Sequence, residues 1–140
     1  MILLDTSVLS RAFRRSRPGS DERRVRSTLE RLLATDAALG LPGPVLQEVL
    51  SGIRSAKQFA ELEGLLVSSF AIVHATTADY IAAAALRNTC LAKGANVSGP
   101  DCLIATLAMA GDHRLVAADN DFRAIAKHSE LKFLTFDELG

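Results

Sequence analysis

The chain has 140 residues, of which 49% are apolar, and its 16 basic and 16 acidic residues leave no formal net charge. This length fits one domain, residues 1–140, and a core that forms without disulfides or structural metal, because chains near this size bury roughly two-thirds of their unfolded surface. Two cysteines without zinc-ligand spacing, no signal peptide and no apolar run of about 20 residues predict a cytoplasmic protein and exclude a membrane span.

Short apolar segments alternate with helical patterns along the whole chain. Prolines precede the helical patterns over 45–53 and 101–110, and Gly94 and Gly111 follow those over 78–92 and 101–110, as expected at helix ends. The alternation predicts an α/β fold, a three-layer α/β/α domain with a central parallel sheet of four to five strands. In chain order the expected elements are a strand over 1–4, helices over 7–14 and 21–35, a strand over 37–41, helices over 45–53 and 57–67, a strand over 70–73, helices over 78–92 and 101–110, a strand over 115–118, a helix over 122–128 and a strand over 132–134.

Acidic residues stand where several of these elements begin or end. Taken singly, each has an ordinary explanation as a helix cap, a turn residue or a solvated side chain. Taken together, carboxylates from distant points of the chain suit a hard divalent cation such as Mg²⁺ or Mn²⁺, and hence chemistry on phosphate esters. The residues are Asp5, Glu48, Asp101 and Asp119, with Asp121 close behind.

Asp101 gives the clearest single indication of a site. It lies three, four and seven positions before Ile104, Ala105 and Ala108, so it shares one helical face with them. That small, apolar face is expected to pack inward. A carboxylate there is costly unless a cation or hydrogen bonds meet it.

Basic residues are concentrated near the start of the chain. Eight of the sixteen lie between positions 11 and 31, and all eight are arginines, including Arg11, Arg14, Arg15 and Arg17. They are either the solvated face of a helical hairpin or a surface for RNA or an acidic partner.

Four segments together resemble the PIN-domain ribonuclease family and, within it, the VapC-type toxins of bacterial toxin–antitoxin pairs. The resemblance covers nearly the whole chain. Its motifs are Leu4-Asp5-Thr6-Ser7, Glu48 in the helix after the second strand, Asp101-Cys-Leu-Ile-Ala105, and Asp119-Asn120-Asp121-Phe122.

This resemblance implies a Mg²⁺- or Mn²⁺-dependent endoribonuclease, the toxin of a type II toxin–antitoxin system. The implied ligands are Asp5, Asp101 and Asp119, with Glu48 as a ligand or a water-orienting group. Thr6 and Ser7 would position a ligand or a water, and Asp121 would replace or support Asp119. Implied partners are an RNA substrate, a small VapB-like antitoxin and a second copy in a homodimer.

Other functions fit the sequence less well. A phosphatase with an Asp-x-Asp start and a response-regulator receiver are disfavoured, because Thr6-Ser7 follows Asp5 and because the third strand leads to His74-Ala75. A catalytically inactive domain of the same fold, binding only RNA or a partner, remains the alternative. All four acidic positions are occupied, which favours the enzyme.

Overall fold

The computed structural model describes residues 1–13, 20–34 and 38–139. Its centre is a five-stranded sheet with the strand order β3-β2-β1-β4-β5. All four strand pairs are parallel, with Leu3 opposite both Gly40 and Leu115. The sheet confirms the predicted α/β architecture with a parallel sheet. The strands are β1 (Ile2–Leu4), β2 (Leu39–Pro42), β3 (Ala71–Val73), β4 (Arg114–Ala117) and β5 (Lys132–Thr135).

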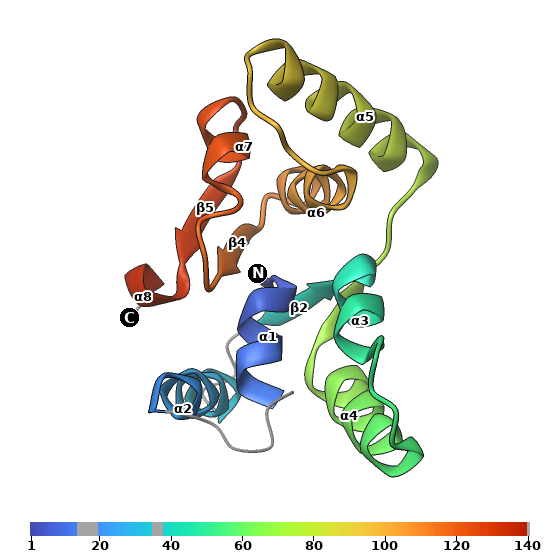
Figure 1. The fold of residues 1–140 in the computed structure, drawn as a ribbon, viewed down its shortest axis with the longest axis vertical. Helices are drawn as coiled ribbons and strands as arrows, with labels where there is room; N and C mark the ends of the chain where they lie inside the picture. Colours follow the sequence, from blue (N-terminus) through green and yellow to red (C-terminus); the bar gives the residue numbers. More distant parts are fainter. Residues whose placement is uncertain (14–19, 35–37, 140) are drawn as a thin grey trace.

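Helices cover both faces of this sheet. The chain runs from β1 through β2 to β3 and then returns to build β4 and β5 on the other side of β1. Because crossovers between parallel strands are almost always right-handed, the two directions place their helices on opposite faces. Figure 1 shows α1 and α2 on one side of the sheet and α5 and α6 on the other. The helices are α1 (Thr6–Phe13), α2 (Ser20–Ala34), α3 (Gly43–Leu50), α4 (Ala56–Ser69), α5 (Thr77–Ala92), α6 (Gly99–Ala110), α7 (Arg123–Lys127) and α8 (Phe136–Leu139).

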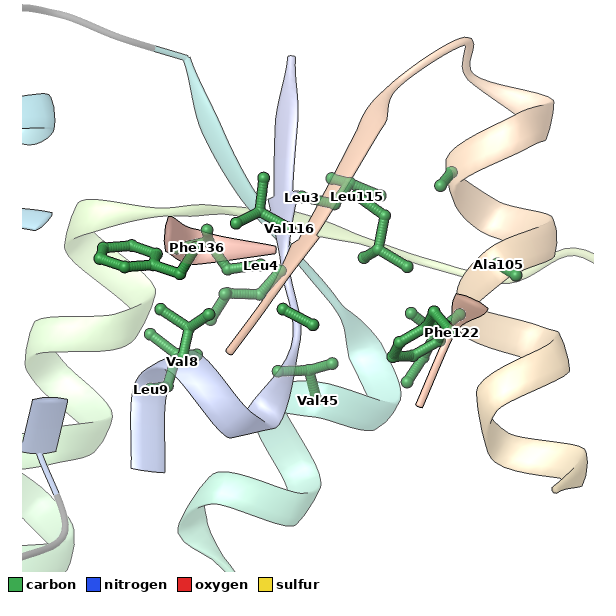
Figure 2. Packing of buried hydrophobic residues seen from close by; sticks show 14 of the residues in the cluster. Leu3, Leu4, Val8, Leu9, Val45, Ala105, Leu115, Val116, Phe122 and Phe136 are labelled. Atoms are coloured by element: carbon green, nitrogen blue, oxygen red, sulfur yellow. The ribbon is translucent and has the colours of Figure 1, made fainter. Parts of the chain in front are cut away.

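The core is mainly aliphatic and lies on both faces of the sheet. Alternate residues of the central strands face opposite sides, as the two-residue period of a strand requires. In Figure 2, Val116 lies toward Val8 and Phe136, whereas Leu115 lies toward Ala105 of α6. The predicted inward face of α6 is confirmed, since Ile104, Ala105 and Ala108 are all buried.

The strand order reverses direction between β1 and β4. From β1 the chain moves outward through β2 to β3, and it then returns to build β4 and β5 on the other side. Such a reversal leaves a crevice at the carboxyl ends of the two strands where open α/β sheets bind their ligands. Asp5 directly follows β1, and Asp119 follows β4 after one intervening residue.

One local prediction was wrong, and one helix was missed. The helix expected over 45–53 ends at Leu50, because Gly52 takes a left-handed conformation with φ of 87°. Helix α8 was not predicted, although Thr135 and Glu138 form the reciprocal hydrogen bonds of a capping box at its start. Among the described residues, no helix is long and apolar enough to cross a bilayer.

Candidate active site at the carboxyl edge of the sheet

Asp5 is the buried member of the acidic group. Its residue is only 8% exposed, and its carboxylate accepts two hydrogen bonds from Ser7, at 2.9 Å from the hydroxyl and 3.2 Å from the backbone N–H. Burial raises the pKa of Asp5, the bonds from Ser7 act in the opposite direction, and the charge of Asp119 adds a smaller rise. The folded protein therefore holds this carboxylate in one orientation at an energetic cost.

Ser7 also connects the two strands that carry aspartates. Its hydroxyl accepts a 2.9 Å hydrogen bond from the backbone N–H of Ala118, the residue before Asp119. The same oxygen that orients Asp5 therefore fixes the start of the loop after β4. This contact gives Ser7, predicted as a supporting residue, a defined structural role.

Asp101 lies in the first turn of α6 and is half-buried. Ser98 caps this helix by accepting a 3.2 Å hydrogen bond from the Asp101 N–H, which fixes the backbone at the site. Burial, followed by the charge of Asp5, raises the pKa of Asp101 to about 6, and the charges of Asp121 and Glu48 contribute further. Three of the other four carboxylates thus raise the pKa of Asp101.

Glu48 reaches the site from α3 and is exposed. The hydroxyl of Thr6 donates a 3.1 Å hydrogen bond to its carboxylate. Because Thr6 adjoins Asp5, this bond connects the helix that carries Glu48 to the end of β1. The sequence predicted a role for Thr6 or Ser7 without dividing it, and the structure pairs Thr6 with Glu48 and Ser7 with Asp5.

The two aspartates of the late motif act on different neighbours. The Asp119 carboxylate accepts a 3.1 Å hydrogen bond from the backbone N–H of Asp121, so the loop folds back on itself. The negative charge of Asp119 raises the pKa of Asp5, whereas the negative charge of Asp121 raises the pKa of Asp101. Phe122 then buries its ring in the core and fixes the end of the loop.

The charges of these five acidic residues interact, but their carboxylates are not arranged as the ligands of one metal ion. Among the described residues, no three Asp, Glu, His or Cys side chains are arranged to hold an ion between them. Their chemistry nevertheless fits a hard cation, since every donor is a carboxylate oxygen and a cation would relieve the repulsion that raises the pKa of Asp101. Binding an ion requires the carboxylates to draw closer together than they lie here.

The arginine-rich segment is described only in part. Arg11 lies in the last turn of α1 and is half-buried. Arg14, Arg15 and Arg17 fall outside the described residues, so their predicted part in binding RNA or an antitoxin stays a prediction.

Sequence reasoning missed Ser98. The signal was present, because Ser98 precedes Asp101 by three positions in the spacing of a capping box. The part played by the Ala118 N–H had no sequence signal, since every residue except proline carries this group.

Sequence comparisons place this chain in a known protein family. The PIN domain sequence model matches residues 2–128. Ribonuclease VapC11 of Mycobacterium tuberculosis is 33% identical over 138 residues, which cover 97% of this chain and 99% of that protein.

Solved structures share the fold at lower identity. VapBC2 from Rickettsia felis, solved with a DNA fragment from its promoter, gives a TM-score of 0.76 at 20% identity and covers 98% of this chain and 100% of that one. VapC20 of Mycobacterium tuberculosis, a toxin that cleaves the sarcin-ricin loop, gives 0.66 at 19% identity and covers 94% and 99%. The sequence matches and the shared fold together establish that this chain belongs to the PIN-domain family and, within it, to the VapC ribonucleases.

Proposed function

We propose that this protein is an endoribonuclease toxin that hydrolyses RNA phosphodiester bonds at the acidic group between β1 and β4. Its membership of the VapC ribonucleases supports the reaction class. The observation that carries the proposal for this site is the position of Asp5 and Asp119 after β1 and β4, where the strand order reverses. Asp101 lies beside them, and burial and three neighbouring carboxylates raise its pKa. Strongly perturbed carboxylates in a crevice are typical of catalytic sites.

The proposed cofactor is Mg²⁺ or Mn²⁺, held by Asp5, Asp101 and Asp119, with Glu48 as a further ligand or the group that orients the attacking water. When bound, such an ion lowers the pKa of a coordinated water and neutralises charge on the phosphate. The oxygen-only donor set supports this choice of a hard cation.

The protein's own residues would then perform separate tasks. Ser7 holds Asp5 in place, and Thr6 holds the exposed carboxylate of Glu48 at the crevice. Ser98 fixes the helix end that carries Asp101. The charge of Asp121 raises the pKa of Asp101, and the charge of Asp119 raises the pKa of Asp5.

The proposed partners are RNA, a VapB-like antitoxin and a second copy of this chain, in the cytoplasm. The structural neighbours support the antitoxin, because several of them are VapBC complexes. Apolar side chains exposed on α4, namely Phe59, Leu65 and Val67, support a contact with protein.

Cleavage of total cellular RNA by the purified, antitoxin-free protein tests this function. Wild type and Asp101→Asn should be compared in Mg²⁺, in Mn²⁺ and in EDTA. Discrete cuts that require metal and disappear in the variant are expected. A folded protein that binds metal but cuts no RNA would instead favour the inactive binding domain.

A further inference from the structure

A pocket lies beside the acidic group, on the side of α5. Its volume is about 420 Å³, and its walls include Pro44, Tyr80, Ala84, Arg87, Pro100 and Leu103. A second hollow of about 280 Å³ contains Glu48 and shares Pro44 and Pro100 with the first. The two hollows therefore meet at these two prolines, and Asp101 directly follows one of them in the chain.

The walls of this pocket combine three kinds of chemistry. Alanine, leucine and proline side chains provide an apolar floor. Tyr80, the chain's only tyrosine, is 59% exposed at the rim. Arg87 contributes a cation whose position is fixed, since its Nε donates a 3.0 Å hydrogen bond to the carbonyl of Val97.

We propose that this pocket receives one unpaired nucleobase of the RNA substrate, stacked on Tyr80, while Arg87 pairs with an adjacent backbone phosphate. The inference rests on the proposed function and extends it to substrate positioning. Single-stranded RNA is bound by aromatic rings that stack on bases and by cations that follow the backbone. A base held here would set which phosphodiester lies over the carboxylates, because the pocket shares Pro44 and Pro100 with the hollow that contains Glu48.

The neighbouring Ile81 distinguishes this occupant from a protein partner. It is 67% exposed on the same helix but does not line the pocket. A second copy packed on this face would bury Tyr80 and Ile81 together, whereas a stacked base would use Tyr80 alone. Ile81→Ala is therefore the matched control for Tyr80→Ala.

The test measures binding of a fluorescein-labelled single-stranded RNA of mixed sequence by anisotropy, in EDTA and at low salt. Tyr80→Ala is expected to weaken binding between about 5- and 150-fold, the range for loss of one stacking ring. Tyr80→Phe and Ile81→Ala should bind like the wild type. Arg87→Gln should make the plot of log affinity against log salt less steep by about 0.7, the value for the loss of one contact to a single-strand phosphate.

Several results would overturn the pocket assignment. They are unchanged affinity in Tyr80→Ala, no saturable binding by the wild type, and equal losses in Tyr80→Ala and Ile81→Ala with a change from dimer to monomer in sedimentation. Cleavage is scored separately. Tyr80-dependent binding without cleavage would refute the nuclease alone, whereas cleavage with intact binding by Tyr80→Ala would refute the pocket alone.

Discussion

Thr6 and Glu48 are joined across two helices by a hydrogen bond of 3.1 Å from the threonine hydroxyl to the glutamate carboxylate. Thr6 begins α1 directly after Asp5, and Glu48 lies on α3. The exposed glutamate would otherwise sample several rotamers. The bond therefore keeps one carboxylate of the site at the same edge of the sheet as the others.

Removing the Thr6 hydroxyl should reduce cleavage without unfolding the protein. Thr6→Val keeps the side-chain shape and loses the donor to Glu48. The rate of RNA cleavage is expected to fall by about 10- to 100-fold, the usual cost of losing a group that orients a ligand. Thr6→Ser keeps the donor and should retain most activity. Cleavage by Thr6→Val at the wild-type rate would show that Glu48 needs no such support.

Ser7→Ala should destabilise the fold as well as the site. It removes the bond to Asp5 and leaves the Ala118 N–H without its acceptor. The free energy of unfolding, measured in urea, is expected to fall by about 1–3 kcal/mol. Ser68→Ala is the control, since this exposed hydroxyl bonds only within α4 and its loss should cost much less. Equal effects of the two changes would contradict the bridging role of Ser7.

Two serine helix caps of the same geometry allow an effect on stability to be distinguished from an effect on cleavage. Ser98 caps α6 at the site, and Ser55 caps α4 away from it, each by accepting a 3.2 Å hydrogen bond from a backbone N–H. Replacing either serine by alanine should cost about 1 kcal/mol of unfolding free energy. Only Ser98→Ala should also slow cleavage, because it loosens the turn that carries Asp101. A similar loss of activity in Ser55→Ala would trace the effect to stability.

The raised pKa of Asp101 predicts a pH-dependent stability. An acid whose folded pKa lies at about 6, above its ordinary 3.8, binds its proton more tightly in the folded chain. The free energy of unfolding should therefore fall as pH rises between these values, and the loss should be complete above about pH 6. Solvent screening of this half-exposed group limits the effect to about 1 kcal/mol.

Asp101→Asn removes this charge and should raise the melting temperature in EDTA. At pH 8 the increase is expected to be about 3–5 °C, and it should disappear near pH 4. Scanning calorimetry of both proteins across this range measures it. A variant that melts below the wild type at pH 8 would mean that the carboxylate contributes more through hydrogen bonds than it costs through repulsion.

The sequence predicted the sheet and the acidic residues because both depend on local signals. Apolar runs and helical spacing located β1, β4 and α6, and the position of Asp5 and Asp119 after strands followed from them. The pairing of Thr6 with Glu48 could not be predicted, since it depends on how α1 packs against α3. The end of α3 was missed for a similar reason, because the apolar spacing continues to Ile53 although the backbone turns at Gly52.

Binding of Mn²⁺ measured beside cleavage of one mapped RNA tests the central claim most directly. Titration calorimetry and a cleavage assay would use the same preparations of wild type, Asp5→Asn and Asp101→Asn. The wild type is expected to bind the ion and cut the RNA, and both variants should lose both properties while staying folded. Their loss of rate should exceed the roughly 100-fold effect of a merely orienting group. Undiminished cleavage in EDTA, or full activity in either variant, would contradict the proposal that these carboxylates hold a catalytic metal.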